Sequence, residues 1–163
     1  MKQEVIQEIE ETFSRLTTAI SKFSEEQFNT IPFEGSWTAG QVSEHIIKSI
    51  GGVPDRKTQS SDRPHDERIE AIRKMFLDFN LKFKTAQPLE PEKHSHHVEE
   101  TLRHLQRLKE LHLHAANTKD LTVLCLDMEL PTFGYLTRYE WLRFMMVHAL
   151  RHTIQIEKIF PLV

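Results

Sequence analysis

Residues 137–159 read TRYEWLRFMMVHALRHTIQIEKI, and this stretch decides the fold. Its apolar positions recur at intervals of three and four, which is the spacing of one face of an α-helix. The stripe that must face the core consists of Trp141, Met145, His148, His152, Ile156 and Ile159. Thr137, with Glu140 three residues later, forms a capping box, so the helix is expected to begin there. The stretch therefore predicts a long helix whose buried face includes two histidines.

Three more segments show the same helical spacing. Residues 2–28 carry apolar side chains on one helical face, and residues 95–116 carry a leucine stripe. Between them, Thr38 and Gln41 form a second capping box, and the helix that begins there ends at Gly51-Gly52. Together with the last helix, these segments predict an all-α, antiparallel four-helix bundle.

The connections between these helices are polar or rich in proline. Residues 54–66 are predicted as a loop, 67–76 as a short helix, and 80–91 as an irregular segment with two prolines. Residues 117–136 are partly apolar and are expected to pack on the bundle. No alternating pattern predicts a strand, and no linker divides the chain, so residues 1–163 are expected to form one domain.

Composition narrows the class of protein. The chain has 163 residues, 39% of them hydrophobic and 28% charged, as in ordinary soluble domains. The formal net charge of -3 gives no basic surplus for nucleic acid or anionic lipid. The single cysteine, Cys125, lies in an apolar run and is expected to be a core residue, which fits a reducing cytoplasm. No apolar stretch reaches the length of a membrane span, and the amino terminus has no signal-peptide pattern.

His148 and His152 are four residues apart, so their imidazoles lie one helical turn apart on the core-facing stripe. His45 lies on the corresponding stripe of the second helix, and a bundle can bring it opposite the other two. Three imidazoles with open positions form a site for a first-row metal. The spacing alone leaves two alternatives open, a metal site or buried structural histidines with hydrogen-bonded nitrogens. Ala149 stands where a zincin would carry glutamate.

The other polar candidates are weaker. The remaining histidines are expected on the surface: His65, His94, His96, His97, His104, His112 and His114. Arg143 and Arg151 flank the stripe and either hold an anionic substrate or lie on the surface. Gln41 either orients a ligand or, as the capping box favours, serves only as the partner of Thr38.

The order of these motifs resembles the DinB-like superfamily, which includes the bacillithiol S-transferases and the mycothiol-dependent maleylpyruvate isomerases. Ser36-Trp37-Thr38 leads into His45, and Glu140-Trp141-Leu142-Arg143-Phe144 leads into His148 and His152. The stretch Pro131-Thr132-Phe133-Gly134-Tyr135-Leu136-Thr137 resembles the family's entry into its last helix. The resemblance extends from the first helix to Ile159.

The resemblance implies an up-down-down-up bundle, often a homodimer, with a divalent metal held by His45, His148 and His152. It implies a small-molecule substrate and a low-molecular-weight thiol, and the activity would then be thiol-dependent S-transfer. Metal-dependent hydrolysis is the second enzymatic alternative. A third is a metal-binding or purely structural dimer without activity. Imidazole ligands suit zinc, nickel, iron or copper, and no residue is assigned a catalytic role.

Overall fold

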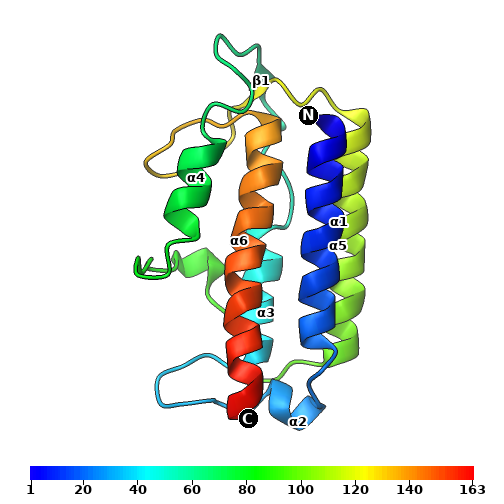
Figure 1. Ribbon diagram of the computed structural model, residues 1–163, viewed down its shortest axis with the longest axis vertical. Helices are drawn as coiled ribbons and strands as arrows, with labels where there is room; N and C mark the ends of the chain where they lie inside the picture. Colours follow the sequence, from blue (N-terminus) through cyan, green and yellow to red (C-terminus); the bar gives the residue numbers. More distant parts are fainter.

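Four long helices dominate the computed structural model, which describes residues 1–163. They are α1 (Lys2–Ile20), α3 (Ala39–Ser49), α5 (Val98–Thr118) and α6 (Arg138–Ile159). In Figure 1, α1 and α6 run downward while α3 and α5 run upward, which is the up-down-down-up path. Both α1 and α3 pack against α5 and α6. The all-α four-helix bundle predicted from the sequence is therefore confirmed.

Capping boxes begin two of these helices, as the sequence predicts. The Thr38 hydroxyl accepts from the Gln41 backbone N–H at 3.1 Å, and Thr137 and Glu140 form the same arrangement. A third box at Ser24 and Gln27 begins the short helix α2 (Glu25–Phe28). The predicted helical face over 2–28 is thus broken, because α1 ends at Ile20 and the chain starts again at Ser24. The Ser24 and Gln27 pair was visible in the sequence.

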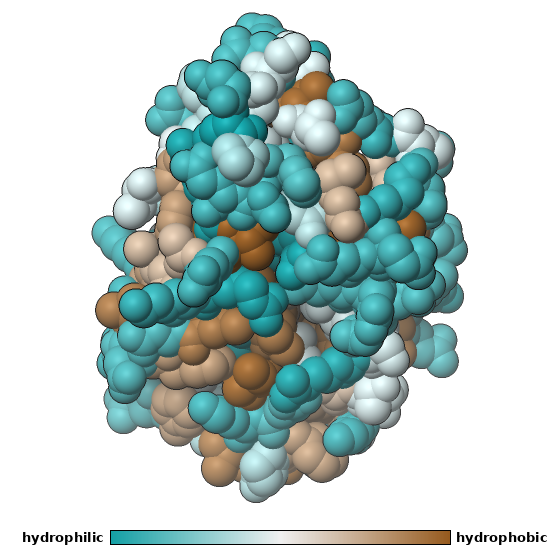
Figure 2. Space-filling model, turned by 45° about the horizontal axis from the view of Figure 1, so that its top comes forward, coloured by the Kyte–Doolittle hydropathy of each residue, from teal (hydrophilic) through white to brown (hydrophobic).

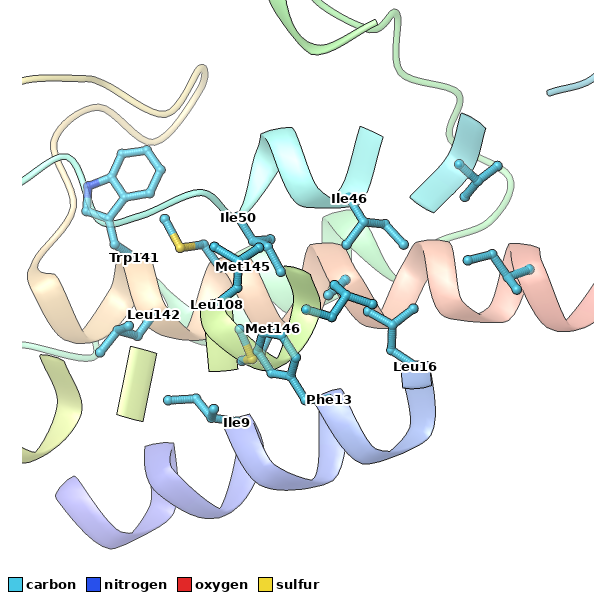
Figure 3. Close-up of a cluster of buried hydrophobic side chains, with 14 of the residues drawn as sticks. Ile9, Phe13, Leu16, Ile46, Ile50, Leu108, Trp141, Leu142, Met145 and Met146 are labelled. Atoms are coloured by element: carbon cyan, nitrogen blue, oxygen red, sulfur yellow. The ribbon is translucent and has the colours of Figure 1, made fainter. Parts of the chain in front are cut away.

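Figure 3 shows how the long helices fill the core. Its labelled, buried side chains are Ile9, Phe13 and Leu16 of α1, Ile46 of α3 and Ile50 just after it, Leu108 of α5, and Trp141, Leu142, Met145 and Met146 of α6. Burial of this apolar surface is the main stabilising contribution to such a fold. Cys125 is also fully buried, and burial raises the pKa of its thiol to about 11, which agrees with a core role.

The prediction that the chain has no strand is wrong in one place. Strand β1 (Thr58–Gln59) pairs antiparallel with β2 (Leu124–Cys125), with Thr58 opposite Cys125. Two-residue strands are too short for alternation to appear in the sequence. The pair joins the loop that follows α3 to the connection that precedes α6.

The remaining elements are short. Helix α4 (Ile69–Phe76) packs against α6. The 3-10 turn η1 (Gln87–Leu89) is the only regular element between α4 and α5, and η2 (Phe160–Leu162) extends α6. None of the helices combines the length and apolar character that crossing a membrane requires. Figure 2 shows hydrophilic residues across the upper part of one face and a group of apolar residues across its lower part.

Candidate metal centre

The packing of α3 against α6 brings together the three histidines that the sequence singles out. His45 is 4% exposed, and His148 and His152 are half-buried. Their ligand nitrogens lie within 4.8 Å of one another, and the Nε2 atoms of His45 and His148 are 3.1 Å apart. The ring of His152 lies 4.6 Å, centroid to centroid, from each of the other two rings.

Two of the imidazoles are oriented by a hydrogen bond on the far side of the ring. His45 Nδ1 donates to the Leu89 carbonyl at 2.9 Å, and His152 Nδ1 donates to Gln155 Oε1 at 2.9 Å. Each bond fixes the ring tautomer, so that Nε2 keeps its lone pair for a ligand. Gln155 follows His152 by three residues on the same helix face, a signal that the sequence contains. The Leu89 carbonyl is brought there only by folding.

The segment that supplies the Leu89 carbonyl is attached to α3 on both sides of His45. Lys48 Nζ donates to the Glu90 carbonyl at 2.8 Å. The Glu44 carboxylate accepts from the backbone N–H groups of Glu92 and Lys93 at 3.0 and 3.2 Å. Glu44 has no assigned role in the sequence, and the structure shows that it holds this segment against the helix that carries His45.

The electrostatics of the site favour neutral imidazoles. Burial lowers the pKa of all three histidines: that of His45 falls below its ordinary value, that of His152 falls to about 4, and that of His148 falls well below 6.5. The charged side chains that act on them are cations, Lys48 on His45 and Arg151 on the other two. None of their hydrogen bonds involves a carboxylate. Neutral imidazole is the form that binds a metal ion.

The arrangement fits a divalent ion. Two buried nitrogen lone pairs that face one another are unfavourable unless a proton or a cation lies between them. Two imidazole nitrogens on one tetrahedral zinc ion would lie about 3.3 Å apart, close to the His45–His148 separation. His148 Nδ1 is buried without a hydrogen-bond partner, so no other polar contact explains the burial of this ring. The donor set is therefore compatible with metal binding.

Two histidines expected on the surface are buried, so those predictions are wrong. His96 is 7% exposed and contacts the Glu44 carboxylate through Nε2 at 2.8 Å. His112 is 1% exposed and contacts the Ile50 carbonyl through Nε2 at 2.8 Å, where it satisfies the end of α3. Both lie outside the three-histidine group, and each has a polar partner from another element that the sequence does not reveal.

The structure separates the two candidate arginines. Arg143 is paired with Glu4 and Glu8 and donates to the Tyr139 hydroxyl, so its charge is compensated inside the bundle. Arg151 instead donates to the carbonyls of a loop and borders a cavity. Gln41 is the partner of Thr38, as the capping box favours.

A separate cleft lies away from the histidines. It has a volume of about 850 Å³ and is lined by α4, the start of α1 and the first turns of α6. Its inner wall includes Tyr139 and Arg143, which bond to one another and to Glu4. These groups therefore satisfy one another, and the cleft contains none of the three histidines.

Comparison with known proteins identifies the family of the chain. The family model described as the DinB superfamily matches residues 8–156. The chain belongs to the DinB superfamily. The match covers α3 and all but the last three residues of α6, including all three histidines, and it confirms the resemblance read from the motifs. Searches of curated proteins and of solved structures found no match to the chain.

Proposed function

We propose that His45, His148 and His152 hold one divalent metal ion and that this DinB-superfamily protein is a thiol-dependent S-transferase. The observation that carries the proposal is the convergence of three neutral imidazoles beside Arg151, with no carboxylate among their hydrogen-bond partners. A divalent ion bound there would lower the pKa of a coordinated thiol, so that the thiol is a thiolate near neutral pH.

The chain's own residues favour an anionic sulfur at this place. Arg151 adds positive charge beside the imidazoles, whereas the charge of Lys48 is compensated by Glu44 and Glu92. No carboxylate accepts from the imidazoles themselves. In the transfer, the thiol sulfur would bond to an electrophilic carbon, the leaving group would depart with its bonding electrons, and the thiol proton would pass to solvent. His45 and His152 stay oriented throughout by Leu89 and Gln155.

Hydrolysis is less well supported by the same contacts. A bound metal ion would also acidify a water, but hydrolysis at a metal site is commonly assisted by a general base within hydrogen-bond reach of that water, most often a carboxylate or a free histidine. The three imidazoles are all engaged with one another, and their other partners are a carbonyl and an amide. Thiol transfer needs no such base, because an acidified thiol is already the nucleophile.

Metal content measured by mass spectrometry tests the site. The purified protein should hold about one equivalent of zinc, nickel or iron, and a triple variant with His45, His148 and His152 changed to Ala should lose it. The matched control changes His94, His97 and His104, which all lie on the surface, to Ala. Absence of metal in the parent after incubation with zinc and nickel would refute the proposal, as would equal loss in both variants.

The reaction is tested with cysteine and glutathione as thiols and 1-chloro-2,4-dinitrobenzene as electrophile. The metal-loaded parent should accelerate thioether formation, and the triple histidine variant should not. Metal-dependent cleavage of p-nitrophenyl acetate without thiol transfer would instead favour the hydrolase. A metal-loaded protein inactive in both assays would favour a structural role. The expected homodimer stays a prediction that sedimentation can check.

A further inference from the structure

We propose that a cationic, aromatic-walled cavity beside the three histidines binds an anionic carboxylate of the substrate. The cavity has a volume of about 190 Å³ and is lined by Phe79, Arg151, Gln155 and Lys158. The claim that the bound carboxylate belongs to a substrate rests on the proposed function. The claim that the cavity binds a carboxylate does not, because it is argued from contacts that involve no metal.

The cavity adjoins the histidines through one shared residue. Gln155 lines the cavity, and the same side chain accepts from His152 Nδ1. Arg151, Gln155 and Lys158 follow one another at intervals of four and three, so they lie on the helix face that also carries His148 and His152. With a rise of 1.5 Å per residue, Lys158 lies about 9 Å beyond His152 along the helix axis. A ligand with a few bonds between its reacting atom and its charge would span this distance.

Both cations of the cavity lack a carboxylate partner. Arg151 donates to the main-chain carbonyls of Phe76, Asp78 and Leu81 at 2.7 to 2.9 Å. Lys158 contacts the ring of Phe79, with Nζ 5.0 Å from its centroid.

Three other arginines in α6 or in contact with it are each paired with a carboxylate. Arg63 contacts Glu140, Arg138 contacts Asp55, and Arg143 contacts Glu4 and Glu8. Asp78, the acidic residue beside Arg151, accepts from the Asn80 backbone N–H. Asp78 keeps its negative charge near Arg151, but neither Arg151 nor Lys158 is held in an ion pair, so both cations can contact a ligand.

A series of aromatic contacts connects Arg151 of the cavity with His148. The Arg151 guanidinium lies over Phe79 and Phe83, 5.2 and 5.1 Å from their centroids. Phe83 stacks on Phe76 at 5.0 Å, and Phe76 lies 6.3 Å from the His148 ring. Phe79 and Phe83 are 45% and 46% exposed, an unusual exposure for phenylalanine that a bound apolar group would reduce. The fitting ligand is thus a carboxylate on an apolar or aromatic body.

The test compares 3-phenylpropionate with 3-phenylpropan-1-ol, which share a frame and differ in the charged carboxylate. Titration calorimetry on the full chain should give the carboxylate a Kd at least about tenfold lower, because the cations favour its charge. Lys158→Gln should reduce the preference to about threefold or less. Lys57→Gln removes the same charge next to β1, at the opposite end of the bundle, and should leave the preference unchanged.

The titrations are made with zinc-loaded and with metal-depleted protein. Equal affinity for both probes in the parent would overturn the inference. A preference that vanishes with the metal and ignores Lys158→Gln would also overturn it, because the carboxylate would then bind the ion. If the chain holds no metal but keeps the preference, the proposed function fails and the anion site stands. If the chain holds the metal but shows no preference for the carboxylate, the anion site fails and the proposed function stands.

Discussion

The Nε2 atoms of His45 and His148 lie 3.1 Å apart, although the two residues are separated by 103 positions in the chain. The first belongs to α3 and the second to α6, so the contact exists only when the bundle is assembled. Burial keeps both rings neutral, and both present nitrogen to the same point. Any ion held between them therefore ties the assembly of the bundle to metal binding.

Metal removal should lower the stability of the folded chain. A ligand that binds only the folded state stabilises it by about 2.7 kcal/mol when its free concentration is 100 times its Kd. Thermal unfolding of the parent should therefore shift upward with zinc and downward with a chelator. His45→Ala should abolish the shift, whereas His104→Ala, on the exposed side of α5, should retain it. A zinc shift of equal size in His45→Ala would contradict a site that requires this residue.

Gly40→Ala should destabilise the start of α3. A Cβ atom at this position would lie 2.8 Å from the His96 ring, which is buried and held by Glu44. Overpacking of this kind costs roughly 1–3 kcal/mol, measurable by urea unfolding. Gly51→Ala is the control, since its nearest contacts are at 3.6 Å and ordinary. His96→Gly removes the Cβ atom and the ring of residue 96, which both lie 2.8 Å from the added Cβ. In that background the change at Gly40 should cost little, and a full cost there would show that the clash lies elsewhere.

Glu140→Gln should be among the most damaging single changes. The Glu140 side chain is fully buried and accepts from both Arg63 guanidinium nitrogens at 2.7 Å and from the Arg68 backbone N–H at 2.9 Å. Removing one partner of a buried pair costs about 3–5 kcal/mol, because the other charge remains uncompensated.

Glu67→Gln provides the matched control for that change. Glu67 contacts the same arginine at 3.9 Å but is 51% exposed, so its loss should cost less than about 1 kcal/mol. Similar losses for the two variants in chemical unfolding would show that the Glu140 contact contributes no more than a surface pair.

His112 should make the protein less stable in mild acid. Burial lowers its pKa below the ordinary 6.5, so between these two values the unfolded chain binds a proton that the folded chain does not. Stability is then complete above pH 6.5 and falls as the pH drops, by at most about 1.4 kcal/mol per unit for this group.

Substitution of His112 shows how much this residue contributes to the pH dependence of the unfolding free energy. His112→Gln can still donate to the Ile50 carbonyl but cannot titrate, so its unfolding free energy should fall less steeply between pH 7 and pH 5. The other buried histidines contribute equally to both proteins and cancel in the difference. Parallel curves for the parent and the variant would assign the acid sensitivity to other groups.

Features that depend on neighbours in the chain could be predicted from the sequence alone. The boxes at Thr38 and Thr137 involve residues three apart, and they begin the helices where expected. The spacing of His148 and His152 places both on one helix face, because the helical period sets which side chains are adjacent. Fold class followed from these local patterns, and the stripe of the second helix indicated His45 as a partner, which the family motifs supported.

Only the tertiary structure decided which polar groups meet across the bundle. It buried His96 against Glu44 and His112 against Ile50, brought the Leu89 carbonyl to His45, and left Arg151 facing a cavity without a carboxylate. These contacts join segments that are far apart in the chain, so no repeating pattern in the sequence predicts which of them meet. Helical periodicity reports the face on which a residue lies, whereas the partner on that face depends on how separate helices and loops pack.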